Sequence, residues 1–273
     1  MKTTMVSTRT ALLAATLAGA LLSLPQVSLA AASGPGATAQ AQTDNPTASN
    51  AAARLNKKQF RNVTVSVDNG IATLSGTVDL FEYKADAEKN VAKARGVTAV
   101  RDDIQVAGPA VSDAALQAKL GEKLAYDRVG YGNTFNAISL SVENGVATLG
   151  GHARTDVDKD SALALVRTYP GVKGVVAHIQ VDPVSIMDDH SRIAVARAVY
   201  SSPMLNKYAI DPAQPIRISV QNGNVELYGV VNNQTDKEVA FIRANTVPGI
   251  FSVKNYLQVA NQPAEGQNKV VTQ

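Results

Sequence analysis

Residues Ile138–Gly151 read ISLSVENGVATLGG, and the chain repeats this pattern twice more. The first copy, Val63–Gly76, reads VTVSVDNGIATLSG, and the third copy, Ile216–Gly229, reads IRISVQNGNVELYG. Each copy places Asn-Gly between two runs of alternating apolar and polar residues. A two-residue type I′ turn needs positive φ at both central positions, which Asn and Gly tolerate best. The sequence therefore predicts three β-hairpins, whose turn residues are Asn69, Gly70, Asn144, Gly145, Asn222 and Gly223.

The turns also predict the register of each hairpin. The second copy pairs Val142 with Ala147, Leu140 with Leu149 and Ile138 with Gly151 on one side of the ribbon. The equivalent last pairs of the other copies end at Gly76 and Gly229. Because a slip of one residue would turn every side chain to the opposite face, three copies with the same apolar face predict a single register.

The hairpins belong to a longer repeat. The turn glycines are 75 and 78 residues apart along the chain, and the glycines that close the hairpins keep the same spacing. Helical periodicity precedes and follows each hairpin, and a third strand pattern ends each copy. We therefore predict an α+β protein of three tandem αββαβ domains, each a three-stranded sheet with two helices packed on it. The expected domains cover residues 47–107, 112–182 and 188–260.

Two local predictions concern helix ends and faces. Asp79–Glu82 fits a capping box and predicts the start of a helix there. In the third copy we expect a helix over about Asp189–Ser201, with its apolar stripe at Ile193, Ala196, Val199 and Tyr200.

The N-terminus has the features of a secretory signal peptide. Lys2 and Arg9 precede an apolar run at residues 11–24, and Ser28-Leu29-Ala30 supplies small residues for cleavage. The run is short for a membrane span. We therefore expect residues 1–30 to be removed, residues 31–46 and 261–273 to be disordered, and the exported protein to be soluble and periplasmic. The chain contains no cysteine, which excludes disulfides, thiolate metal sites and thiol catalysis.

The net charge gives no sign of a nucleic-acid-binding protein. The sequence pI is about 9.0, but the first 30 residues hold two of the 26 basic side chains and none of the 23 acidic ones. The remainder has a net charge of about +1 and no clustered basic face. We expect no nucleic-acid partner.

The αββαβ order, the strand–Asn-Gly–strand–Gly hairpin and the Gly-Val or Gly-Ile before the last strand closely resemble the BON domain. The resemblance covers about residues 47–260. In organisation the chain is similar to osmotically induced periplasmic proteins with tandem BON domains, which commonly have two copies. The resemblance implies an exported, cofactor-free protein that binds phospholipid or other envelope components and maintains the envelope under osmotic or related stress.

No catalytic or metal-binding motif competes with this interpretation. Asp156–Asp160 resembles the start of a calcium loop, but Ser161 and Arg167 stand where an EF-hand needs Gly and Glu. The acidic residues are therefore expected to favour a helix N-terminus. His152, His178 and His190 lack ligand spacing and are expected on the surface. We predict a protein that is not an enzyme and uses no metal or cofactor.

The remaining candidate is a surface for anionic headgroups. Basic and aromatic side chains in and after the first helix of the second copy could meet a membrane, and the third copy offers a similar loop. The lipid-contact candidates are Lys119, Lys123, Arg128, Tyr131, Phe135, Lys207 and Tyr208. The alternative for the aromatic residues is that they close the hydrophobic core under the loop. The alternative function is a protein–protein adaptor, or a chaperone-like module for envelope proteins.

Overall fold

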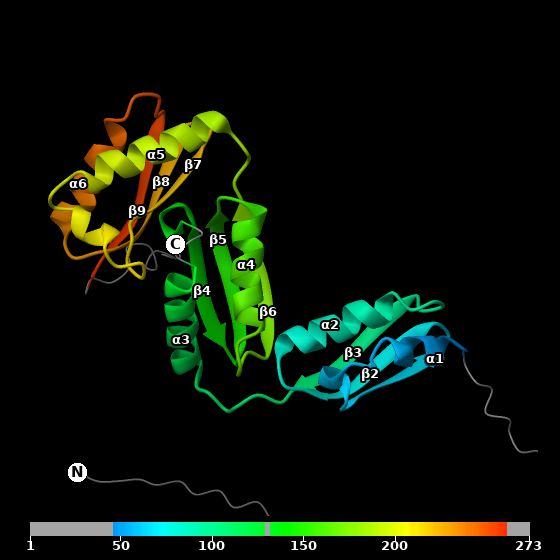
Figure 1. The fold of residues 1–273 in the computed structure, drawn as a ribbon. Coiled ribbons are helices and arrows are strands. Elements are labelled where there is room, and N and C mark those ends of the chain that lie inside the picture. The colour runs from blue at the N-terminus through cyan, green and yellow to red at the C-terminus, as the bar shows by residue number, and fades with distance from the viewer. Residues whose placement is uncertain (1–45, 129–131, 261–273) are drawn as a thin grey trace, which may run out of the picture. The chain divides into compact units, whose positions relative to one another are not determined.

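The computed structural model describes residues 46–128 and 132–260, which form three units that each contain a three-stranded sheet (Figure 1). The first unit comprises α1 (Pro46–Ala53), the 3-10 helix η1 (Lys58–Phe60), β1 (Val63–Asp68), β2 (Ile71–Val78), α2 (Phe81–Ala92) and β3 (Ala99–Val106). The second comprises α3 (Asp113–Tyr126), the 3-10 helix η3 (Asn133–Phe135), β4 (Ala137–Glu143), β5 (Val146–Ala153), α4 (Asp156–Arg167) and β6 (Gly174–Val181). The third comprises α5 (Ile186–Tyr200), the 3-10 helix η4 (Asn206–Ala209), β7 (Arg217–Gln221), β8 (Asn224–Val231), α6 (Gln234–Asn245) and β9 (Ser252–Val259).

The strands follow one topology in all three units. The first two strands of each sheet pair antiparallel, and the third strand pairs parallel to the second after a helical crossover. Figure 1 shows the two helices of a unit against its sheet. The predicted α+β fold of three αββαβ domains is therefore confirmed.

The hairpin turns have the predicted type I′ geometry. Asn69, Asn144 and Asn222 have φ of 49°, 53° and 50°, and the glycine that follows each also has positive φ. The glycines farthest from the turn in each predicted hairpin have a different structural role. A Cβ at Gly76 or Gly151 would collide with the backbone carbonyl oxygen that precedes the hairpin. Only glycine lets the two backbones approach so closely.

The predicted register is confirmed in the first two hairpins down to the pairs Val63–Gly76 and Ile138–Gly151. The third hairpin pairs Ile218 with Leu227 as expected, but β7 begins only at Arg217, so Ile216 lies outside the ladder. Pro215 precedes it and has no N–H to donate, which favours a later strand start.

Each unit has its own apolar core between sheet and helices. Leu74, Leu149 and Leu227 occupy the same hairpin position in the three copies, and all are fully buried. Two aromatic residues also pack across unit boundaries: Phe81 contacts the core of the second unit and Phe135 that of the third. Neighbouring units are therefore in contact.

Two local predictions were wrong. The helix after the first hairpin begins at Phe81, and Leu80, its N-cap residue, makes no side-chain capping bond, so the capping box at Asp79 does not form. The first helix of the third unit begins at Ile186, earlier than expected, because Ser185 caps it. Of the predicted apolar stripe, Val199 is buried and Ala196 and Tyr200 pack against the core, but Ile193 is half-exposed. The buried face also carries Asp188, Arg192 and Val195. Polar residues take buried positions there because they have internal partners.

One of these internal contacts was not predicted from the sequence. Asp188, in the first turn of α5, accepts hydrogen bonds from the backbone N–H groups of Asn222 and Gly223, both at 2.9 Å. Asp113, at the start of α3, holds Asn144 and Gly145 in the same way at 2.7 and 2.8 Å. A carboxylate at the helix start thus fixes the hairpin turn in the second and third units.

Candidate functional site

A buried ionic network joins the second unit to the third. Asp182, at the end of β6, is almost fully buried and accepts a hydrogen bond from Arg192 of α5 at 3.1 Å. From β7, Gln221 and Ser219 also donate to Asp182, at 2.7 and 3.2 Å. Arg192 in turn donates to the carbonyl oxygen of Val220 at 2.7 Å. A buried pair with this many partners makes the contact between the units specific in geometry.

Histidine and tyrosine rings extend the network. Nδ1 of His152 lies 3.3 Å from the Asp182 carboxylate, and its ring stacks on Tyr228 with centroids 6.4 Å apart. The expectation that His152 is a surface residue is therefore wrong, since its contacts are with this junction; His178 and His190 are exposed, as expected. On the far side of the junction, the Tyr126 hydroxyl donates to Asp211 at 3.0 Å.

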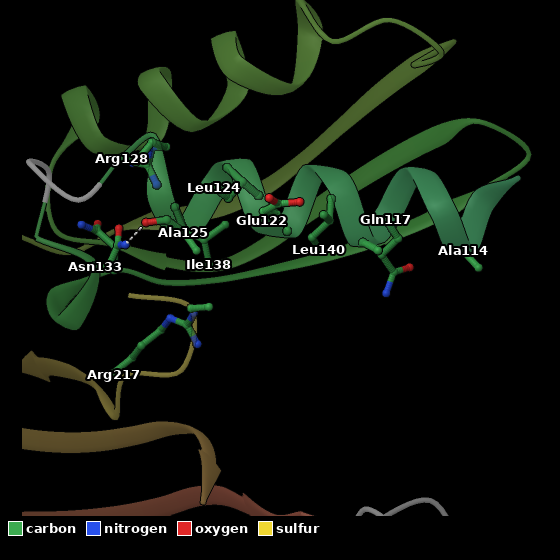
Figure 2. A pocket seen from close by; sticks show the side chains of 14 residues that line it. Ala114, Gln117, Glu122, Leu124, Ala125, Arg128, Asn133, Ile138, Leu140 and Arg217 are labelled. Atoms are coloured by element: carbon green, nitrogen blue, oxygen red, sulfur yellow. Dashed lines mark hydrogen bonds between the residues drawn. The ribbon is translucent and has the colours of Figure 1, made fainter. Parts of the chain in front are cut away.

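Next to this junction lies a cleft of about 560 Å³ (Figure 2). Residues of α3 and β4 line most of it, and Ala213 and Arg217, before and at the start of β7, line the remaining side. The apolar part of the lining is Ala114, Ala118, Gly121, Leu124, Ala125, Ile138, Leu140 and Ala213. The polar part is Gln117, Glu122, Arg128, Asn133, Asn136 and Arg217. Figure 2 places Arg128 and Asn133 toward one end of the cleft, and Gln117 and Glu122 along α3.

The two arginines in this lining differ in their partners. Arg128 is buried, and its guanidinium donates to the carbonyl oxygen of Asp158 at 2.6 Å and to the Ser161 hydroxyl at 2.8 Å. Arg217 is partly buried, and burial lowers the pKa of its guanidinium. No hydrogen bond or ion pair joins the Arg217 guanidinium to any residue that the structure describes. The carboxylate in the lining, that of Glu122, pairs with Lys119 at 3.0 Å.

The predicted lipid-contact residues lie in different environments. Lys119 and Lys123 are exposed on α3, where each pairs with an acidic neighbour, Glu122 or Asp127. Arg128 and Tyr208 are buried, so they cannot reach a membrane in this conformation.

The other candidates also have internal partners or cannot be placed. Phe135 packs against the core of the third unit, under the guanidinium of Arg154 at 6.0 Å. Lys207 pairs with Asp236 at 2.8 Å. Tyr131 lies outside the described residues. For Tyr208 the alternative predicted from the sequence, that aromatics close the core under the loop, agrees with its packing, whereas Phe135 packs against the core of the neighbouring unit.

An apolar surface patch surrounds the start of α5. It consists of Val184, Ile186, Met187 and Phe251, whose exposed fractions are 98, 75, 73 and 81%. Beside it is a hollow of about 550 Å³ that includes Met187, Phe251 and Pro248. The equivalent place in the second unit is covered, because Pro109 and Val111 lie over Gly171. A Cβ at the matching Gly249 would meet nothing within 4 Å.

The sequence contained a usable signal for this patch but not for Arg217. The apolar residues Val184, Ile186 and Met187 lie in or directly after the short connection between β6 and α5, where polar residues are the norm. Arg217 occupies a polar position in an alternating strand, and nothing in that pattern distinguishes it from a solvated side chain.

Other kinds of site receive no support from the described part of the chain. Within residues 46–128 and 132–260 there is no cluster of three or more His, Asp or Glu that could hold a metal ion. Asp156 and Asp158 lie in the first turn of α4, with Thr155 as N-cap, as their predicted role at a helix start requires. No helix in these residues is long and apolar enough to cross a membrane.

Comparisons with solved structures give low similarity. CdsD, a structural protein of the type III secretion system of Chlamydia trachomatis, aligns through its C-terminal domain at 19% identity with a TM-score of 0.23, over 77% of this chain and 96% of that chain. The periplasmic domain of the type III secretion inner-membrane protein PrgH from S. typhimurium aligns at 10% identity with a TM-score of 0.19, over 76% and 97%. At these scores neither match carries an argument.

Comparison with curated protein sequences gives no match. Comparison with protein-family models is decisive, because the model described as BON domain matches residues 43–108, 112–183 and 204–261, well over half of the chain. The first two matches span the whole of the first and second units, and the third covers the third unit from η4 onward, without α5. The chain therefore belongs to the BON domain family.

Proposed function

We propose that the protein is a non-enzymatic periplasmic BON-domain protein that binds the phospholipid surface of the cell envelope and maintains the envelope under osmotic or related stress. Export depends on the signal peptide expected at residues 1–30. The observation that carries lipid binding is the apolar patch of Val184, Ile186, Met187 and Phe251. Contiguous exposed apolar side chains are typical of protein or membrane interaction sites.

The chemistry of the patch suits a bilayer interface. Its side chains surround one helix start, so they can enter the headgroup region together and bury apolar area there. Basic side chains would add attraction to anionic lipids, and the exposed lysines of α3, Lys119 and Lys123, supply them. Each lysine pairs with an acidic neighbour, and the net charge without residues 1–30 is about +1. The electrostatic contribution should therefore be small and sensitive to salt.

Vesicle flotation tests this proposal. Residues 44–273 contain all the described elements and form one compact unit, so they can be used without the apolar N-terminus. We expect them to float with vesicles of phosphatidylglycerol and phosphatidylcholine at low ionic strength, and less at high salt. The double variant Met187→Ser, Phe251→Ser should float at least about tenfold less, because each apolar side chain withdrawn from water contributes roughly 1.5–3 kcal/mol.

Ile242→Ser is the matched control, since Ile242 is a half-exposed apolar residue on α6 that is not one of the patch residues. It should float as the unchanged protein does. Failure of the unchanged residues 44–273 to float at low salt would refute the lipid proposal, and equal loss in both variants would refute the role of the patch.

The second candidate function is a protein–protein adaptor or a chaperone-like module for envelope proteins. The hollow beside the patch favours it, because a concave apolar site of about 550 Å³ can accept a protruding side chain of a partner. Recovery of one defined envelope protein in pull-downs, lost in the Met187→Ser, Phe251→Ser variant and unaffected by added vesicles, would support the adaptor over lipid binding.

A further inference from the structure

The cleft beside α3 contains an arginine, Arg217, whose charge has no carboxylate partner within residues 46–128 and 132–260. Arg217 is partly buried and points from the start of β7 toward α3 and β4 (Figure 2). Burial lowers the pKa of its guanidinium, and among the described residues it has no carboxylate partner. Removing a cation from water is unfavourable unless an anion and hydrogen-bond acceptors replace the lost hydration. An anion bound from solution would supply that compensation.

The polar side chains near Arg217 already have other partners, so an incoming anion does not compete with them for the Arg217 guanidinium. The Tyr200 hydroxyl already donates to the carbonyl oxygen of Ile216 at 2.7 Å, and burial raises the pKa of Tyr200 to about 12, so it stays neutral. Asn133 uses its amide to donate to the carbonyl oxygen of Ala125 at 2.6 Å. The Glu122 carboxylate is held by Lys119 at 3.0 Å.

The remaining lining of the cleft favours the binding of an alkyl chain rather than of an extended peptide. Leu124, Ile138 and Leu140 form its apolar surface, and Gly121 leaves room above them. β4 is an edge strand, which a peptide could extend by backbone hydrogen bonds. However, Gln117 already accepts from the N–H of Val142 at 3.1 Å, and Asp113 accepts from that of Asn144. Side chains of α3 therefore seal this part of the strand edge.

We propose that this cleft binds one molecule of an anionic single-chain amphiphile, with its carboxylate or phosphate on Arg217 and its alkyl chain between α3 and β4. A guanidinium binds either anion through two parallel N–H donors. The volume of about 560 Å³ lies within the range of small-molecule sites. Both a free fatty acid and a lysophospholipid have this chemistry.

Isothermal titration of residues 44–273 with dodecanoate and with dodecyl phosphate, each below its critical micelle concentration, tests the proposal and distinguishes the two headgroups. We expect binding of one molecule per protein for at least one of them. Inorganic phosphate alone and uncharged dodecyl maltoside should bind at least about tenfold more weakly, because each lacks one half of the interaction. Equal binding of dodecyl maltoside, or no binding of either anionic probe, would overturn the proposal.

Arg217→Gln should weaken binding by about 10- to 100-fold, the loss of a charge-assisted hydrogen bond, and Arg217→Lys by less. Arg243→Gln, at an exposed arginine of α6, is the matched control and should bind as the unchanged protein does. The melting temperature separates the roles of Arg217. A ligand site predicts that Arg217→Gln keeps or raises it, because the variant removes a partly buried charge that has no carboxylate partner among the described residues. A lowered melting temperature with unchanged affinity would make Arg217 a structural residue and contradict the proposal.

Gly121→Leu tests the apolar part of the cleft and leaves Arg217 unchanged. Gly121 lies within α3, and a Cβ there meets nothing within 4 Å, so the fold accepts a side chain. Leucine is also the better helix former. The variant should melt at the same or a higher temperature and yet lose amphiphile binding, because its side chain fills the cleft; a variant that binds normally would refute this placement of the chain.

This inference is independent of the vesicle proposal. The Met187→Ser, Phe251→Ser variant should bind the monomeric amphiphile normally, and Arg217→Gln should float with vesicles normally. Each proposal can therefore fail while the other stands.

Discussion

The first and third units share one hairpin pattern but bury it to different depths. In the first unit Val65, in the middle of β1, is half-buried, whereas its counterpart Ile218 in β7 is fully buried. The helix before the hairpin is α1 in the first unit, with 8 residues, and α5 in the third, with 15. The apolar face of β7 is buried at both Ile218 and Val220, while that of β1 is only partly buried along its length.

The comparison shows that an alternating strand determines which face turns inward but not how much of that face is covered. Helix length alone does not determine coverage, since Leu140, the counterpart on β4, is only partly buried although α3 has 14 residues. In the third unit, Phe135 of the neighbouring unit adds to the packing on the core. Buried apolar area stabilises by about 25 cal/mol per Å². The first hairpin should therefore depend less on its apolar side chains than the third. Three predictions test this difference, from the largest expected effect to the smallest.

The largest effect is expected from truncation of the matched hairpin residues. Ile218→Ala should destabilise the third unit by about 2–5 kcal/mol, because it leaves a cavity in a packed core. Val65→Ala should cost the first unit about 1 kcal/mol, since less area is withdrawn from water there. Hydrogen exchange measured by mass spectrometry resolves the two hairpins separately, which matters because the chain has no tryptophan to report unfolding.

Val230→Ala, at a half-exposed position of β8, is the control for the truncation and should lie within about 0.5 kcal/mol of the unchanged protein. Equal losses of exchange protection in the Ile218 and Val65 variants would contradict the argument from the depth of burial.

The second prediction concerns the carboxylate that holds a turn. Asp188→Ala should destabilise the third unit by about 2 kcal/mol, because it removes a charged acceptor from two backbone N–H groups at 2.9 Å. The first turn of α1 has no acidic residue, so the first hairpin forms without this contact. Asp113→Ala should have a similar effect in the second unit.

Exchange of the turn amides at Asn222 and Gly223 measures the effect of Asp188 directly. Glu88→Ala, at an exposed position of α2, is the control and should leave all three hairpins unchanged. Unchanged protection of these turn amides in Asp188→Ala would show that the turn geometry alone stabilises the hairpin.

The sequence predicted what depends on backbone geometry and missed what depends on partners distant in the chain. Asn-Gly turns and alternating strands determine φ and register locally, so both were predictable. Burial of Arg192 was not, because its partners Asp182 and Val220 lie on other elements. Arg128 and Tyr208 were expected to face a membrane for the same reason: their residue types suggest a surface, and only the fold supplies their internal partners.

The smallest effect is expected from the hydrogen bond between Tyr208 and Asp236, and it depends on pH. Tyr208 donates to the buried Asp236 carboxylate at 2.6 Å and Lys207 pairs with it at 2.8 Å. Burial by itself raises the pKa of Asp236, but these two donors hold the pKa below its ordinary value overall. The first unit has Tyr83 at the position that the repeat spacing aligns with Asp158 and Asp236, so it lacks this carboxylate.

Because the pKa of Asp236 is lower in the folded protein than in the unfolded chain, its contribution is fully present above the unfolded value of about 3.9 and is lost as the pH falls through the folded pKa. Tyr208→Phe should cost about 1 kcal/mol near pH 7, the net value of one hydrogen bond, and should raise the pKa of Asp236 toward its ordinary value. Urea unfolding followed by hydrogen exchange at about pH 7 and about pH 3 measures both effects. The third unit should lose more stability than the first through this group on acidification, and Asp236→Asn should reduce that difference. An Asp236→Asn variant as acid-sensitive as the unchanged protein would place the pH dependence on other carboxylates.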